Sequence, residues 1–156
     1  MKFLEKLFLV ITIIIFSYPI SAQTFKSDDI LTPEKIQDKL ISSQQPDDLG
    51  FYQVQFLDKP TKLRFNNGNI TSEIVMKYNN GMEYGLTDGN KIVEDLTTSI
   101  AQLFPNDNFK ISYDIPTFGS CIGNSIIYLN GPIIISIYHD YSINSKKGDI
   151  LIRIVY

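Results

Sequence analysis

Apolar and polar residues alternate along much of this chain, which is the pattern of strands with one buried face. Between residues 51 and 86 the alternation is interrupted by two Asn-Asn-Gly triplets, at 66–68 and 79–81, and both are typical turn sequences. A second β-rich stretch runs over 109–156. The pattern therefore predicts two blocks of antiparallel strands, the first of them a meander with one face toward solvent.

Two segments have helical periodicity instead. The first begins near Pro33, which suits the first turn of a helix, and ends near Pro46. Ile36, Leu40 and Ile41 form its apolar edge. The residues before this segment, from 23 to about 30, are mostly polar, and we expect them to be a flexible lead-in.

The second helix is expected between the Thr87-Asp88-Gly89-Asn90 start signal and Pro105. Its apolar stripe consists of Ile92, Val93, Leu96, Ile100, Leu103 and Phe104. This stripe should pack on the sheet, and Thr97 is expected on the outer face. The fold class predicted is α+β, a single domain over 23–156 with two helices packed on an antiparallel sheet of about seven strands.

The first 22 residues have the layout of a cleavable signal peptide. Lys2 and Lys6 precede an uncharged apolar run, and the segment ends on a small residue, Ala22. The alternative is a retained membrane anchor, but Pro19 interrupts the run well short of the roughly 20 residues that a spanning helix needs. We therefore expect a secreted or periplasmic protein that begins at Gln23, with no stable membrane insertion after cleavage.

Charge and cysteine content narrow the possible partners. The chain has 14 Lys and Arg against 17 Asp and Glu, and its longest basic run is Lys146-Lys147. Binding along nucleic-acid phosphates requires clustered cations, so nucleic acid is not an expected partner. The single cysteine, Cys121, cannot form a disulfide within the chain. A buried thiol is its ordinary interpretation, and pairing between molecules is the alternative.

The chemistry-bearing residues suggest one enzymatic hypothesis. Cys121 with His139, the only histidine, oriented by Asp140 or Asp114, would make a small cysteine hydrolase. One cysteine and one histidine also occur together by chance, so we predict no catalytic residue beyond this candidate pair. No cofactor motif is present, and one nitrogen ligand beside carboxylates is a poor donor set, so we predict neither a cofactor nor a metal.

A binding surface is predicted in the segment 138–147. It links two apolar strands and is longer than the 2–5 residues that a hairpin turn usually takes. Long loops on a rigid sheet are favoured places for recognition residues. The residues predicted to bind are Tyr138, His139, Asp140, Tyr141, Lys146 and Lys147.

Together these observations favour an exported, non-enzymatic binding module that recognises another protein, of the inhibitor, immunity or envelope-assembly type. Two alternatives stay open. One is the cysteine hydrolase described above. The other is a carrier of a small apolar ligand held between the sheet and a helix.

Overall fold

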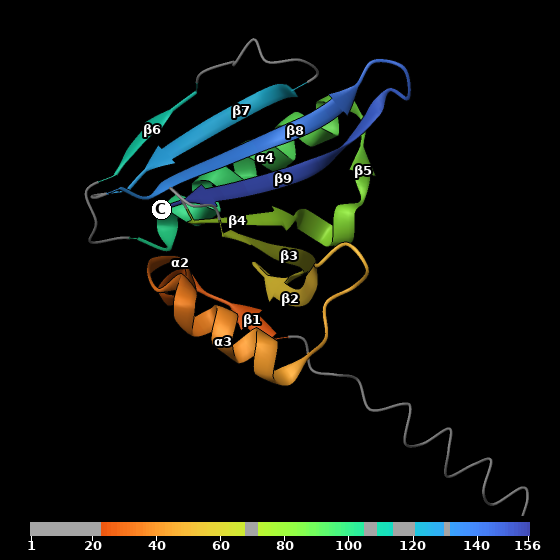
Figure 1. Cartoon of the computed structure of the whole chain (residues 1–156). Coiled ribbons are helices and arrows are strands. Elements are labelled where there is room, and N and C mark those ends of the chain that lie inside the picture. The colour runs from red at the N-terminus through yellow and green to blue at the C-terminus, as the bar shows by residue number, and fades with distance from the viewer. Residues whose placement is uncertain (1–22, 68–71, 105–108, 114–120, 130–131) are drawn as a thin grey trace, which may run out of the picture.

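The computed structural model describes residues 23–67, 72–104, 109–113, 121–129 and 132–156. Over these ranges it is an α+β fold with one mixed sheet of nine strands and three α-helices (Figure 1). The predicted class is confirmed, and the sheet is larger than predicted. The predicted signal peptide, 1–22, lies outside the described residues.

The elements have the following bounds. The strands are β1 (Gln23–Phe25), β2 (Tyr52–Phe56), β3 (Lys59–Asn67), β4 (Ser72–Lys77), β5 (Glu83–Tyr84), β6 (Lys110–Ser112), β7 (Cys121–Tyr128), β8 (Ile134–Ser142) and β9 (Lys147–Val155). The helices are α2 (Ser27–Leu31), α3 (Pro33–Ser43) and α4 (Leu86–Gln102), with a 3-10 turn, η1 (Tyr78–Gly81).

The strand order of the sheet is β1-β2-β3-β4-β9-β8-β7-β6, and β5 pairs with the start of β9. All neighbours are antiparallel except β1, which runs parallel to β2. The purely antiparallel sheet predicted from the sequence is therefore wrong at this edge. The reason is that the segment 26–51, with two helices, separates β1 from β2 and allows a parallel return.

The period-two pattern places one face of the sheet in the core. Ile74 and Met76 of β4 stand opposite Ile154 and Ile152 of β9, and all four are buried. On the other side of β9, Ile152 stands opposite the buried Ile137 of β8. Helix α4 covers this face along β7, β8 and β9 (Figure 1). Side chains of the sheet and the helices form one hydrophobic cluster.

Helix α4 has the predicted apolar stripe, with one correction. Val93, Leu96 and Ile100 are buried, as expected for residues three and four apart on one face. Thr97 is also fully buried, at 0% exposure, and the prediction that it faces solvent is wrong. Its hydroxyl is bonded to the backbone oxygen of Val93 and to the hydroxyl of Ser125 on β7, so a polar residue is accommodated on the core face.

The N-terminal region is ordered over part of the predicted lead-in. Phe25 of β1 and Ile30 of α2 are buried in the core, so the expectation of a flexible lead-in over 23–30 is wrong. Helix α3 begins at Pro33 as predicted, and Ile36 and Leu40 are buried. Ile41, expected on the same apolar edge, is 54% exposed.

The predicted long loop at 138–147 is mostly strand. β8 continues to Ser142 and β9 begins at Lys147, so the turn between them has only the four residues 143–146. The register continues without a break from His139, opposite Ile150, to Ser142, opposite Lys147. The sequence predicts a loop here because the segment is rich in polar residues, and the exposed end of a strand has a similar composition.

Candidate functional site

His139 lies inside the fold, at 0% exposure. Its Nε2 is 3.1 Å from the backbone oxygen of Tyr84, and its ring meets that of Tyr141 edge to face with 5.4 Å between the centroids. Its Nδ1 is buried without a hydrogen-bond partner among the described residues. The ring also presses on Gly89 of α4, where an added Cβ would lie less than 3.0 Å from three ring atoms. Nothing of this histidine reaches the surface.

The strand register decides how the predicted catalytic pair is arranged. Cys121 of β7 stands opposite Asp140, and the next residue, Ile122, stands opposite His139, before a register shift between Ile122 and Asn124. The side chain of Cys121 is not described, and Asp114 lies outside the described residues. A general base must reach the proton it takes, and the buried His139 ring is not open to a substrate.

The six residues predicted to bind a partner do not form one surface. Successive residues of a strand point to opposite faces, so His139 and Tyr141 share one face while Tyr138 and Asp140 share the other. Tyr138 and Tyr141 are partly buried, whereas Asp140 is exposed. Lys146 and Lys147 are exposed at the β8–β9 turn. The structure thus separates the set, and His139 belongs to the core.

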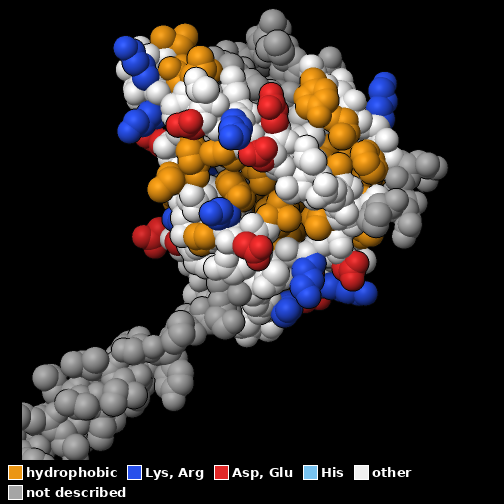
Figure 2. Space-filling view, turned by 180° about the vertical axis from the view of Figure 1, so that it is seen from behind, with side chains coloured by type: hydrophobic (Ala, Val, Ile, Leu, Met, Phe, Trp, Pro, Cys, Tyr) orange, Lys and Arg blue, Asp and Glu red, His pale blue; other side chains and the backbone are white. Residues whose placement is uncertain are grey.

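Sequence reasoning did not identify the groove that runs beside α4, which we call the α4 groove. It has a volume of about 400 Å³. It is lined by Leu57, Lys59, Tyr78, Asn79, Tyr84, Ile92, Asp95, Leu96 and Ser99. These residues come from the β2–β3 hairpin, η1, β5 and α4, four segments that are separate in sequence. Figure 2, seen from the α4 side, shows hydrophobic side chains gathered in the middle of this face with charged side chains around them.

Two left-handed turns form one wall of the groove. Leu57 and Asp58 are the two loop residues between β2 and β3, with φ of 48° and 60°. Hairpin turns with two positive φ values normally use Asn and Gly, because other side chains crowd the backbone there. Asn79 and Asn80 of η1 also have positive φ, but asparagine tolerates this conformation well. A leucine in this conformation places an apolar side chain at the edge of the groove.

The tyrosines of the groove differ in their surroundings. The Tyr84 hydroxyl accepts a hydrogen bond of 2.7 Å from Nδ2 of Asn79. Tyr78 is 9% exposed, and burial raises the pKa of its hydroxyl above the usual value of 10.0. The neighbouring Tyr84 hydroxyl and then the charges of Asp58 and Asp95 add to this rise in pKa. The groove lining combines apolar and aromatic residues with four polar ones, Lys59, Asn79, Asp95 and Ser99.

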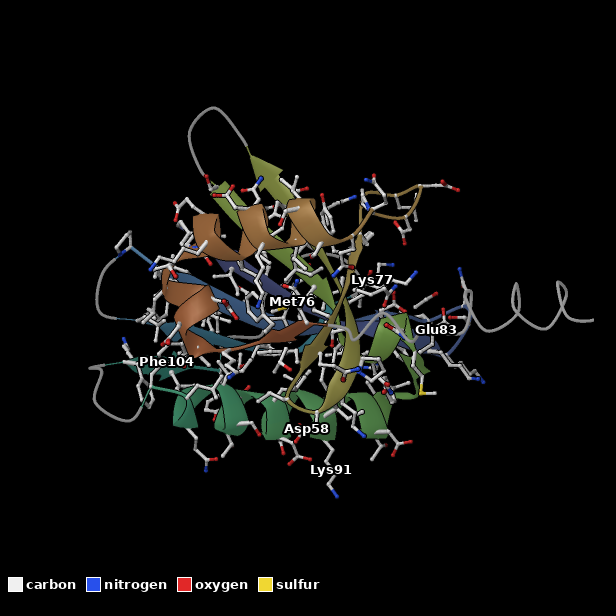
Figure 3. All side chains as sticks on the ribbon, turned by 90° about the horizontal axis from the view of Figure 1, so that it is seen from below. Asp58, Met76, Lys77, Glu83, Lys91 and Phe104 are labelled. Carbon is white, nitrogen blue, oxygen red and sulfur yellow. The ribbon has the colours of Figure 1, made fainter. Side chains whose placement is uncertain are left out.

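The hairpin tip stands close to the helix. Figure 3 shows Asp58 at the β2–β3 turn beside α4, with Lys91 of that helix pointing away from the sheet. The ion pairs among the described residues are Lys62–Asp47, Lys77–Asp149 and Arg153–Glu73. None of them involves Asp58 or Asp95, although Lys59 lines the groove together with Asp95.

Other kinds of site were searched for in the same part of the chain. No three His, Cys, Asp or Glu side chains of the described residues lie close enough to hold a metal ion together. Among the described residues, no helix combines the length and the apolar character needed to cross a membrane. Comparison of the chain with protein-family models, with curated proteins and with solved structures gave no match.

Proposed function

We propose that this protein is an exported, non-enzymatic binding module that recognises another protein through the α4 groove. The observation that carries the proposal is the groove itself, which has a volume of about 400 Å³ and a lining that combines apolar and aromatic residues with the charged Lys59 and Asp95. On this face of the molecule, hydrophobic side chains gather with charged ones around them (Figure 2). Protein interfaces concentrate binding energy where one large side chain enters such a pocket. Inhibitor, immunity and envelope-assembly proteins are modules that act by binding another protein and catalyse no reaction.

Export is the second part of the proposal and rests on the basic, apolar and small-residue order of segment 1–22. Cleavage after Ala22 would leave Gln23 as the first residue. N-terminal sequencing of protein recovered from outside the cytoplasm should begin at Gln23. Recovery of protein with an intact Met1 would show that the segment is not removed.

Blocking the groove tests the binding function. Ser99 lines the groove, and its hydroxyl donates to the backbone oxygen of Asp95 one helical turn earlier. Ser99→Phe should fill the groove. Ser42 of α3 is exposed and makes a similar bond to the backbone of Lys39, so Ser42→Phe is the matched control. Circular dichroism and urea unfolding of both variants confirm that each is folded before binding is measured.

The binding experiment uses a displayed library of random peptides, selected on the wild-type protein. Enriched peptides should bind wild type and Ser42→Phe equally. They should bind Ser99→Phe at least about fivefold more weakly, because loss of a central interface contact typically costs more than 1 kcal/mol. Equal binding to both phenylalanine variants would place recognition elsewhere on the molecule. If no peptide is enriched, the α4 groove is not a site for protein segments.

A second candidate function is carriage of a small apolar ligand. It is favoured by the groove volume, because sites for small molecules span roughly 300–1,000 Å³. Titration with Nile red, an uncharged apolar dye, distinguishes this function from the first. Saturable binding of one dye molecule that is lost in Ser99→Phe would favour the carrier. Absent or non-saturable dye binding, together with groove-dependent peptide binding, would favour recognition of protein.

A further inference from the structure

We propose that the side chain received by the α4 groove is a basic one, an arginine or a lysine of the partner. This inference rests on the proposed function and specifies the chemistry of the partner. The alkyl part of the basic side chain would lie against Leu57 and Ile92, and its charge would lie between Asp58 and Asp95. The partner would therefore present an exposed cation to this face of the protein.

Charge is the first argument. Asp58 lies at the hairpin turn beside α4, and Asp95 of α4 lines the groove together with Tyr78. Neither is paired with a described cation. Both carboxylates are exposed, so each attracts a nearby cation with the strength expected between solvated charges. Among the described residues, these two carboxylates outnumber Lys59, the cation that lines the groove.

The shape of the lining is the second argument. Lysine and arginine have long apolar stems and a charged end, so they bury the stem on apolar surface and keep the end near polar groups. Leu57 and Ile92 supply such apolar surface, and both pack against the core. The rings of Tyr78 and Tyr84 supply aromatic surface, which attracts cations over the ring face. A neutral apolar side chain would contact only the apolar surface of Leu57 and Ile92.

The positive charge of Lys59 opposes the binding of a cation, so replacing this residue tests whether the bound side chain is basic. Lys59 lines the same groove on the hairpin side and is exposed. Its positive charge repels an incoming cation, so a basic ligand should bind more tightly after Lys59→Gln. A ligand held only by apolar contacts should not respond to that substitution.

The experiment uses short synthetic peptides, acetylated and amidated, that differ at one position: Gly-X-Gly with X as arginine, lysine, citrulline or norleucine. Citrulline has nearly the shape of arginine without its charge. Binding to the full chain is followed by NMR shifts of the groove residues. We expect the arginine and lysine peptides to bind at least about fivefold more tightly than the citrulline peptide, which is the size of one charge interaction near 4 Å in a solvated setting.

Matched variants locate the effect. Asp95→Asn should lower the affinity for the arginine peptide by about fivefold. Glu94→Gln removes the same charge from the neighbouring residue, which is exposed and outside the groove lining, and should change affinity by less than about twofold. Addition of 0.5 M NaCl should reduce the preference for the charged peptides, because exposed charges are screened at about that concentration.

The possible failures are distinguishable. If norleucine or citrulline binds the groove as tightly as arginine, the groove still recognises protein segments and the inference of a basic side chain is wrong. The same conclusion follows if Asp95→Asn and Glu94→Gln have equal effects, or if Lys59→Gln weakens the arginine peptide. If peptides selected from the library bind Ser99→Phe normally, the proposed function itself fails.

Discussion

Replacing Gly89 with alanine tests the contact between α4 and the buried histidine. The glycine lies in the first turns of the helix with its Cα against the imidazole of His139. An alanine Cβ at this position would lie less than 3.0 Å from three ring atoms. The ring is held on its other sides by the backbone oxygen of Tyr84 and by the ring of Tyr141, so it cannot move without losing contacts.

Three effects set the size of the change. At an unconstrained helix position, glycine to alanine stabilises by about 1 kcal/mol. Overpacking of a dense core costs about 1–3 kcal/mol. Movement of the ring also breaks the Nε2 contact to Tyr84, worth about 1 kcal/mol. Gly89→Ala should therefore lower the free energy of unfolding by about 1–3 kcal/mol, opposite in sign to the intrinsic helix preference.

Urea unfolding of a double-mutant cycle measures this coupling. In the His139→Ala background the new methyl group has space, so Gly89→Ala should become neutral or stabilising, and the coupling energy should reach about 2 kcal/mol or more. Gly85→Ala is the control, because a Cβ there meets nothing within 4 Å, and it should stay within about 1 kcal/mol of wild type. If Gly89→Ala stabilises the protein, or if the two substitutions are additive, the packing argument is refuted.

The other predictions also concern the buried face. Leu96→Ala should cost about 2–5 kcal/mol in urea unfolding, as for a core leucine. Thr97→Ala should cost about 1–3 kcal/mol because it leaves the buried Ser125 hydroxyl without its partner. Thr98→Ala, on the exposed side of the helix, should change the free energy of unfolding by less than about 0.5 kcal/mol, and equal effects of the two substitutions would contradict the burial of Thr97. Burial raises the pKa of the Tyr156 hydroxyl, which donates a hydrogen bond to the backbone oxygen of Ile30 in α2. The stability that this group contributes below about pH 10 should therefore be lost as the pH rises further. Tyr156→Phe should make the free energy of unfolding depend less on pH across the alkaline range.

The sequence predicted those parts of the fold that depend on local periodicity. The α4 stripe and the alternation of Ile150, Ile152 and Ile154 both determine which face is buried. Thr97 was assigned wrongly because a polar residue on a core face is acceptable only when a partner lies opposite it, and Ser125 is 28 residues away in sequence. The parallel pairing of β1 depends on where the chain returns after α3, which local patterns do not encode.

The α4 groove could not be predicted for a related reason. Its η1 side had a signal, since Asn79-Asn80-Gly81 was recognised as a turn. Its hairpin side had none, because Leu57-Asp58 lacks the glycine or asparagine that normally marks two positive φ values. The predicted binding set includes His139, the only histidine in the sequence, and the structure places that residue in the core.

The position of β9 has a consequence for how the chain can be made. This last strand lies between β4 and β8, so it joins the half of the sheet built from β1–β4 to the half built from β6–β8. The two halves are joined only when β9 pairs with both β4 and β8, and pairing between segments so far apart in sequence makes folding slow. A product truncated before Lys147 would have two half-sheets with unpaired facing edges, which is the kind of surface that aggregates.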